Sequence, residues 1–498
     1  MSAKVVVREP GGRLSVPGPR RILGGVCNVA RYVKDPVGHL TVLFRAYGPI
    51  VSLARGGGTR IVSPNPDCPG SVAVYGPELV RKVKTPHATW EIPPLTGALY
   101  PLGEVSPRKA PLKTFATGLW GVQGEEHRVH RKVLLPAFHR EQVGKYREDI
   151  VAQTSSMLDR WKPGDEVDLH EQLLDLTADI AMRVLFGAEG ADIDDGEGPE
   201  QTAERIWALV ASPLTQLAPY DLPALPYRRF LDLVATFDRQ MREIIGRKRA
   251  AGATSHPDVL STLISSTDVG SGSRLTVDQL VGHVGSIFGA AHETTASAIT
   301  WTIFLLSQHP AVASDLLDEL DGVASGTPPA GVQLQELPLL DRVVNESLRI
   351  IPPVPVQWRI AAERIEVGEY AIPPGTEVYS SSYHTQHMAA LFRDPESFNP
   401  SRWESLDPST YEYTPFGAGP RRCMGDLFAL LEMKIILSML LPRYRLQTAP
   451  RLRMDRAGFP VIRPARGLPV VVNTQDRRFD RPVTVVTGNV REMVALPA

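Results

Sequence analysis

The stretch 276–308 constrains the fold of this chain more than any other segment. It begins with Thr276-Val277-Asp278-Gln279, where the spacing of threonine and glutamine is typical of the capping box that opens a helix. No proline interrupts it before Pro310, and a helix usually ends before the residue that precedes a proline. We therefore expect one helix, which at about 1.5 Å per residue would be about 50 Å long.

A helix of this length with an apolar centre either crosses a membrane or runs through the middle of a large protein. Gly285 and Gly289 have the spacing of a transmembrane packing motif. However, His283, His292 and Glu293 lie in the same centre, and each would be costly to place in lipid. The sequence therefore favours a helix buried inside a large protein over a membrane-embedded one.

Composition excludes several classes of protein. The 498 residues are 43% hydrophobic and 22% charged, as in ordinary globular proteins, and 54 Lys and Arg balance 55 Asp and Glu, so nucleic acid is not expected as a partner. The three cysteines, Cys27, Cys68 and Cys423, are too few for a disulfide framework and indicate a reducing compartment. Basic residues interrupt the apolar residues at the N-terminus. We expect a cytoplasmic protein with no signal peptide and no membrane anchor.

Helical periodicity dominates the chain, and shorter β-prone runs punctuate it. These runs gather in three places, near 49–75, 354–380 and 455–472. No internal repeat or linker divides the chain. We expect a mainly α fold with small β-sheets, forming a single domain over residues 1–475, and a C-terminal tail, 476–498, of unknown role.

The strongest chemical signal is a glycine-rich loop followed by an apolar helix, Pro415-Phe416-Gly417-Ala418-Gly419-Pro420-Arg421-Arg422-Cys423-Met424-Gly425 and then Asp426 onward. A cysteine at a helix N-terminus has its thiolate favoured by the helix dipole and by free backbone N–H groups. The glycines allow close approach to a flat cofactor, Phe416 can shield the sulfur, and Arg421 can reach a carboxylate. A buried structural cysteine is the alternative interpretation.

This loop matches Phe-x-x-Gly-x-Arg-x-Cys-x-Gly and resembles the haem-binding loop of the cytochrome P450 family. The resemblance implies the cytochrome P450 fold, with haem between the long central helix and the helix that follows the cysteine loop. It further implies heme b (iron protoporphyrin IX), axially ligated by Cys423 as the metal ligand. The loop residues expected to bind the cofactor are Phe416, Gly417, Arg421, Cys423 and Gly425.

A second element of the resemblance is Glu346-Ser347-Leu348-Arg349, with an acid and a base on one face of a helix. Alone it would be a solvated ion pair. The family pairs this Glu-x-x-Arg with an arginine in Phe-x-Pro-x-Arg, and Phe398-Asn399-Pro400-Ser401-Arg402 fits that pattern. The resemblance therefore implies that Glu346, Arg349 and Arg402 form a structural clamp.

The long helix carries Ala290-Ala291-His292-Glu293-Thr294, where the family has Ala/Gly-Gly-x-Asp/Glu-Thr. A carboxylate and a hydroxyl in an apolar helix can deliver protons, so Glu293 and Thr294 are the expected catalytic residues. Ala290 is expected beside the cofactor. A threonine that only bonds back to its own helix is the alternative for Thr294. Ala291 replaces the usual glycine, and its methyl group would narrow the groove beside the haem.

Three further residues resemble those that grip the haem propionates in the family. His127 and Arg131 are four residues apart on one helix face, and Arg359 follows the proline-rich turn after Arg349. Apolar positions predict a substrate pocket, although each fits ordinary core equally well. The pocket candidates are Phe288, Ala291, Val354, Val356 and Phe459.

The resemblance implies a haem-thiolate monooxygenase that inserts one oxygen atom from O2 into a small, mostly hydrophobic organic substrate. No flavin or iron–sulfur segment follows the haem domain, so a ferredoxin or flavodoxin with its NAD(P)H-dependent reductase is the expected electron donor. A basic patch could receive an acidic partner, formed by Arg128, Lys132, Arg140 and Arg422.

Two alternatives remain open at this point. A peroxide-using or substrate-rearranging haem-thiolate enzyme is disfavoured by the intact Glu293-Thr294 pair and slightly favoured by Ala291. A non-catalytic haem-binding sensor would need no substrate pocket, so substrate-induced spectral shifts would discriminate it.

Overall fold

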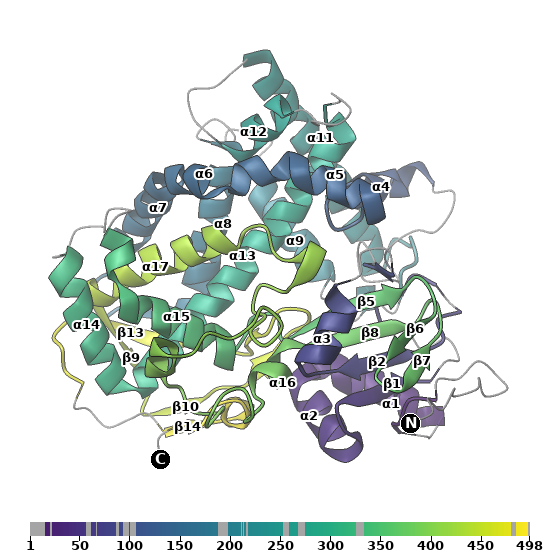
Figure 1. Cartoon of the computed structure of the whole chain (residues 1–498). Helices are drawn as coiled ribbons and strands as arrows, with labels where there is room; N and C mark the ends of the chain where they lie inside the picture. The colour runs from purple at the N-terminus through teal and green to yellow at the C-terminus, as the bar shows by residue number, and fades with distance from the viewer. Residues whose placement is uncertain are drawn as a thin grey trace.

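The computed structural model describes residues 15–19, 22–55, 61–65, 67–85, 89–92, 99, 106–187, 198–210, 212, 214–215, 218–251, 258–266, 274–324, 333–479 and 485–496. A sheet-rich part, which contains the N-terminal helices, lies beside a larger helical part (Figure 1). The prediction of a mainly α fold with small β-sheets is confirmed.

The helices account for most of the described chain. In chain order they are α1 (Ile22–Lys34), α2 (Pro36–Tyr47), α3 (Pro77–Lys84), α4 (Ala110–Ala116), α5 (Gly124–Leu134), α6 (Arg140–Lys145), α7 (Arg147–Arg160), α8 (Leu169–Phe186), α9 (Pro199–Val210), α11 (Pro226–Ala251), α12 (Val259–Ser265), α13 (Val277–Gln308), α14 (Pro310–Ala324), α15 (Pro338–Ile350), α16 (Ser382–Gln386) and α17 (Asp426–Arg443).

The largest sheet has the strand order β1 (Ile50–Ala54), β2 (Ser71–Val74), β8 (Glu377–Ser381), β5 (Val356–Ala361) and β3 (Trp90–Glu91). β1 and β2 pair antiparallel, and β2 pairs parallel with β8. β5 runs antiparallel to β8, with Gln357 opposite Ser380 and Arg359 opposite Val378. Because Gln357 and Arg359 are two residues apart on one strand, they share a face of the sheet.

The remaining strands form smaller sheets. They are β4 (Glu166–Asp168), β13 (Pro469–Thr474) and β9 (Tyr444–Thr448) in one sheet, and the pairs β6 (Ile365–Val367) with β7 (Tyr370–Ile372), β10 (Arg451–Arg453) with β14 (Val485–Thr487), and β11 (Arg456–Ala457) with β12 (Arg463–Pro464). Each of the three β-prone regions expected from the sequence therefore contains strands.

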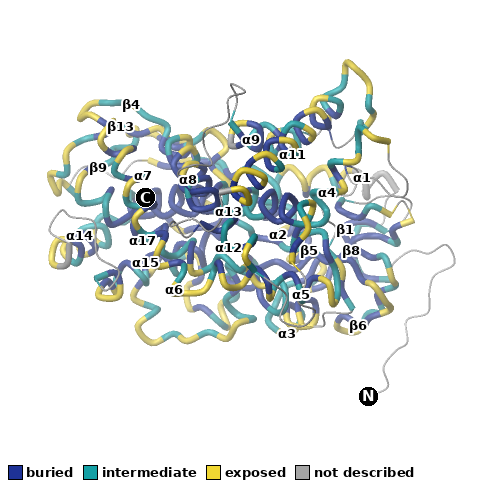
Figure 2. The backbone as a smooth tube through the Cα atoms, turned by 90° about the horizontal axis from the view of Figure 1, so that it is seen from above, coloured by how far each residue is buried: buried dark blue, intermediate teal, exposed yellow. Residues whose placement is uncertain are grey.

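The long helix predicted from the sequence is α13, and its capping box is present. Thr276 Oγ1 accepts from the backbone N–H of Gln279 at 3.2 Å, and Gln279 Oε1 accepts from that of Thr276 at 2.9 Å. α13 runs through the helical part, where α8, α15 and α17 pack against it (Figures 1 and 2). Among the helices in the described ranges, none combines the length and apolar character needed to cross a membrane.

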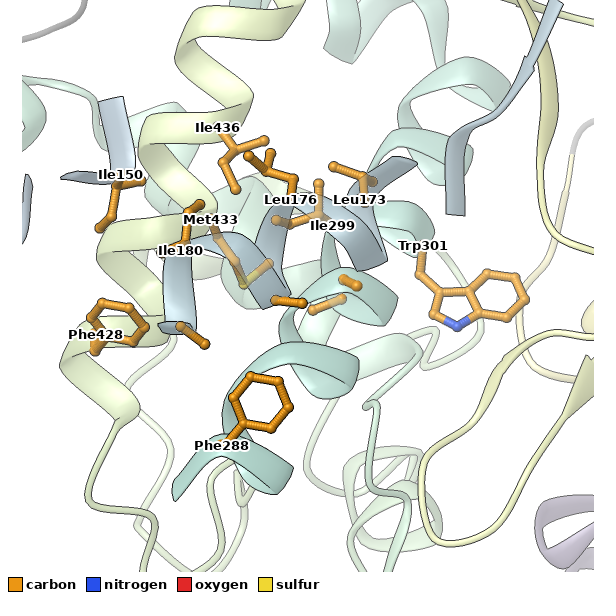
Figure 3. Packing of buried hydrophobic residues seen from close by; sticks show 14 of the residues in the cluster. Ile150, Leu173, Leu176, Ile180, Phe288, Ile299, Trp301, Phe428, Met433 and Ile436 are labelled. Atoms are coloured by element: carbon orange, nitrogen blue, oxygen red, sulfur yellow. The ribbon is translucent and has the colours of Figure 1, made fainter. Parts of the chain in front are cut away.

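The main core lies where α7, α8, α13 and α17 meet (Figure 3). Aliphatic side chains from each helix interdigitate there, and they are almost fully removed from solvent. They include Ile150, Leu173, Leu176, Ile180, Ile299, Met433 and Ile436. Burying such apolar surface stabilises the packing by about 25 cal/mol per Å². This packing fixes α17, and the loop that precedes α17, relative to α13.

The C-terminal tail packs against the rest of the fold, which the sequence did not indicate. β14 pairs parallel with β10, and the backbone N–H of Ala495 donates to Glu396 O at 2.7 Å. Arg456, which is almost fully buried, bonds both Asp35 at the start of α2 and Glu492 in the tail, each at 2.7 Å. The tail therefore connects the C-terminal strands to the N-terminal helices.

Candidate functional site

The cysteine loop folds back on itself immediately before α17. The backbone N–H of Cys423 donates to Phe416 O at 2.9 Å and closes the loop. Gly417 and Gly419 have φ values of +72° and +70°, a region that side chains with a Cβ rarely adopt. A Cβ on Gly419 would also overlap the carbonyl of Lys84, so this glycine allows α3 to approach the loop.

The surroundings of the Cys423 thiol have opposing effects on its pKa. Cys423 is solvent-accessible, yet protein atoms surround it densely. Burial raises the pKa of the Cys423 thiol to about 11, which outweighs the opposing effects of the Gly425 N–H, Arg131 and Arg422. Desolvation therefore opposes the thiolate more strongly than the helix end favours it, although the Gly425 N–H acts in the direction expected from the sequence. A bound metal cation would deprotonate the sulfur.

Arg131, Arg359 and Arg421, all predicted to hold cofactor carboxylates, gather near this thiol. Burial lowers the pKa of Arg359 to about 10. Burial lowers the pKa of Arg421 to about 9, and repulsion from Arg359 and Arg131 contributes less to the same shift. Within the described part of the chain, no carboxylate lies within 4 Å of any of the three. A set of desolvated cations without anions is unfavourable on its own and suits a ligand that carries carboxylates.

The donors of Arg421 are directed at the loop that precedes α5. Its Nη1 donates to Leu119 O at 2.9 Å, and its Nη2 donates to Val122 O at 2.6 Å and Gln123 Oε1 at 2.9 Å. Arg421 thus ties the cysteine loop to this segment, and a contact of Arg421 with a cofactor carboxylate stays a prediction. On α5, His127 is buried and Arg131 lies one turn later, which fits the expected pair.

The sequence analysis missed Lys84, the last residue of α3. Its side chain is 3% exposed, and its Nζ donates to Gln357 Oε1 at 2.6 Å. Burial, followed by repulsion from Arg359, lowers the pKa of Lys84 well below its usual value. Nothing in the basic segment Arg81-Lys82-Val83-Lys84 distinguishes the buried lysine from its exposed neighbours except its position four residues after the buried Val80.

On α13, the structure brings Glu293 close to a residue that the sequence analysis did not identify. Arg463 of β12 lies 3.6 Å from the Glu293 carboxylate. Burial raises the pKa of Glu293, and Arg463 opposes that rise. Thr294 Oγ1 donates to Ala290 O at 2.7 Å, so its proton is used within the helix, as the alternative interpretation held. Its oxygen still has acceptor capacity.

Four of the five predicted pocket residues lie in or against two hydrophobic clusters. Phe288 is buried in the main core, where its ring packs against His292, and Val356 is buried in the core of the large sheet. Phe459 stacks on Trp358 with ring centroids 5.3 Å apart. Val354 and Ala291 are partly exposed. A pocket role for these five stays a prediction.

Aromatic side chains from other segments lie against the glycines of α13. A Cβ on Gly289, next to Ala290, would overlap the indole of Trp207 on α9, and a Cβ on Gly285 would lie 2.8 Å from the ring of Phe115 on α4. Trp207 in turn makes an edge contact with Trp120, with centroids 5.7 Å apart. The glycines that suggested a membrane motif therefore make room for aromatic side chains.

The clamp residues come together as the family resemblance implied. Glu346 accepts from Arg349 through both carboxylate oxygens and from Arg402 Nε, each at 2.9 Å. The Glu346 carboxylate also accepts hydrogen bonds from Trp403 Nε1 at 2.9 Å and from the backbone N–H of Asn399 at 3.0 Å. The two arginines also donate to a set of backbone carbonyls in the segment before the cysteine loop, those of Gln386, Arg393, Asp394, Pro395 and Ser397.

The fold and this site define a haem-thiolate protein. The cytochrome P450 family model matches residues 105–464, and the chain belongs to that family. The prediction of an oxidoreductase that incorporates molecular oxygen is thereby confirmed.

Two curated relatives and one solved structure illustrate the similarity. Cyclooctat-9-en-7-ol 5-monooxygenase of Streptomyces melanosporofaciens is 31% identical over 66% of this chain and 72% of its own. Cytokinin hydroxylase of Arabidopsis thaliana is 27% identical over 92% of this chain and 91% of its own. The structure of retinoic acid bound cyanobacterial CYP120A1 has a TM-score of 0.77 at 22% identity and covers 93% of this chain and 99% of its own.

Haem fits the residues present. A thiol on a glycine-rich loop supplies one soft ligand, and the arginines without a carboxylate within 4 Å among the described residues suit the carboxylates of a porphyrin. Membership of the family implies a haem cofactor with cysteine ligation, together with O2 and an electron donor.

Proposed function

We propose that this protein is a monooxygenase that uses heme b, ligated by Cys423, to insert one oxygen atom from O2 into a small, mostly hydrophobic substrate. The observation that carries the proposal is the cluster of buried Arg359 with the half-buried Arg131 and Arg421, none of which has a carboxylate within 4 Å among the described residues, near the Cys423 thiol. A single domain over residues 1–475 is part of the same proposal, with the packed tail as its C-terminal edge.

The bound haem supplies the oxygen chemistry, and the chain supplies binding, orientation and protons. Arg131 and Arg359 hold the cofactor's carboxylates, with His127 beside them on α5. Glu293 exchanges protons with solvent, since its side chain is 35% exposed, and Arg463 limits how far burial raises its pKa. Thr294 accepts a hydrogen bond while its own proton is held by Ala290 O.

The proposed function also includes a substrate class and an electron donor. The name of the bacterial relative denotes an alkene alcohol, an apolar molecule with one polar group. Phe115, Trp120 and Trp207 along α13 offer aromatic surface for such a molecule. Electrons come from a separate ferredoxin or flavodoxin with its NAD(P)H-dependent reductase, and the protein acts in the cytoplasm.

The absorption spectrum of the purified protein, ferric and then reduced under carbon monoxide, tests the proposal in the wild type and in Cys423→Ala. We expect a strongly red-shifted carbon monoxide band that the mutation removes. A band that survives in Cys423→Ala, or no haem band in the wild type, would overturn the ligand assignment. Apolar alcohols and their hydrocarbon precursors are then screened by the shift of the ferric haem band on binding.

A further inference from the structure

Lys84 and Gln357 form a contact that no part of the proposed mechanism uses. Lys84 lies at the end of α3, and Gln357 lies on β5 two residues before Arg359. Their hydrogen bond of 2.6 Å is buried on the lysine side, where 3% of the side chain is exposed. In the described ranges, no acidic side chain lies within ion-pair distance of Lys84.

Both residues contact the cysteine loop. A Cβ on Gly417 would lie 3.0 Å from Gln357 Oε1, so the Gln357 side chain packs directly on the loop backbone. The carbonyl of Lys84 packs on Gly419. The two loop glycines with positive φ are therefore the points where Lys84 and Gln357 approach the loop that carries Cys423.

Lys84 also extends the cationic cluster of the site. Arg359 repels the Lys84 ammonium, and Arg359 also repels Arg421. A buried ammonium without an anionic partner is costly, and a negative group bound nearby would offset that cost. Carboxylates of a bound cofactor would favour the charged form of Lys84.

We propose that Lys84 is a positioning residue of the haem site, which acts through Gln357 to fix the Cys423 loop and adds a positive charge to the arginines that face the cofactor's carboxylates. The inference rests on the proposed function, because it requires haem bound at Cys423. A positive charge near the iron stabilises its reduced form, which carries one positive charge fewer. Lys84 is then expected to raise the reduction potential of the iron.

The test compares Lys84→Met with Lys82→Met in the haem-loaded protein. Lys82 is the matched control, because it is an exposed lysine on the same helix. Two quantities are measured, the Fe(III)/Fe(II) midpoint potential by spectroelectrochemistry and the rate of haem transfer to apomyoglobin. We expect Lys84→Met to shift the Fe(III)/Fe(II) equilibrium toward Fe(III) by about threefold to tenfold, where tenfold corresponds to 59 mV for one electron, and to release haem faster. Lys82→Met should match the wild type.

Two further variants keep the test decisive. Lys84→Gln keeps a hydrogen-bond donor for Gln357 but removes the positive charge. We expect it to lower the midpoint potential as Lys84→Met does, and it replaces Lys84→Met if that variant does not fold. Lys84→Arg keeps the charge and should keep the potential. A wild-type potential in both uncharged variants would overturn the proposal. A wild type without a cysteine-dependent carbon monoxide band would instead overturn the proposed function, so the two failures are distinguishable.

Discussion

Arg463 Nε lies 3.6 Å from Glu293 Oε1 and joins strand β12 to the centre of helix α13. Glu293 is the proposed proton donor, and Arg463 is the cation that opposes the effect of burial on its pKa. The contact joins the C-terminal part of the chain to the carboxylate that we propose as the proton donor.

Replacing Arg463 with Gln should alter the pH dependence of the reaction. Without Arg463, burial acts unopposed and the pKa of Glu293 rises further, so the carboxylate becomes protonated at a higher pH. Because the proposed donor then stays protonated to a higher pH, we expect the alkaline limb of the profile of product formed per NAD(P)H oxidised to move to higher pH. Arg466→Gln, which changes an exposed arginine three residues later, is the control. An unchanged pH profile in Arg463→Gln would show that Arg463 does not affect proton delivery.

Replacing Glu346 with Gln should destabilise the whole haem domain. The carboxylate is fully buried and accepts from Arg349 and Arg402, so the substitution leaves two desolvated guanidinium groups without an anion. We expect a loss of about 3–5 kcal/mol in the free energy of unfolding and a lower haem content, measured by denaturant unfolding and by the haem absorbance per protein. Glu336→Gln, at an exposed position, should lose less than about 0.5 kcal/mol. A small loss in Glu346→Gln would contradict the clamp.

His283 should contribute to acid sensitivity. It is fully buried on α13, neither ring nitrogen has a hydrogen-bond partner among the described residues, and burial together with His130 lowers its pKa to about 3. Between pH 6.5 and pH 3, His283 therefore binds a proton in the unfolded state but not in the folded state. The free energy of unfolding falls as the pH drops through this range.

His283→Leu removes this titration without breaking a hydrogen bond. Between pH 6.5 and about pH 5, the variant should lose about 2 kcal/mol less stability than the wild type, as measured by urea unfolding at the two pH values. His139→Leu, at an exposed site, should follow the wild type. Equal acid sensitivity in His283→Leu and the wild type would show that His283 is not the group responsible.

Gly289→Ala should change substrate binding while leaving the haem ligand intact. The new methyl group would overlap the indole of Trp207, which must move away from α13. We expect the Kd of an apolar ligand, from the ferric haem band shift, to change by about tenfold, equivalent to about 1.4 kcal/mol, with an unchanged carbon monoxide band. Gly246→Ala on α11, where a Cβ meets no other group, is the control. Identical ligand affinity would place Trp207 outside the pocket.

Short-range sequence patterns predicted much of the fold and of the candidate site. The Thr276–Gln279 capping box, the fold class and the Glu346–Arg349 spacing were predictable because each depends on residues within a few positions of one another. The cysteine loop was recognisable for the same reason. Its thiol pKa was not, because desolvation by distant segments outweighs the local helix end.

Only the tertiary structure revealed the charge contacts made by Lys84, Arg463 and Arg456. Lys84 looks like its exposed neighbours in sequence, and it becomes part of the site only because α3 packs on the glycines of the cysteine loop. Arg463 reaches Glu293, and the tail reaches Asp35 through Arg456, by the same kind of long-range packing. The sequence by itself determined the local elements and the ligand loop, whereas burial and electrostatics at the site depend on contacts between segments far apart in the chain, which only the packed core fixes.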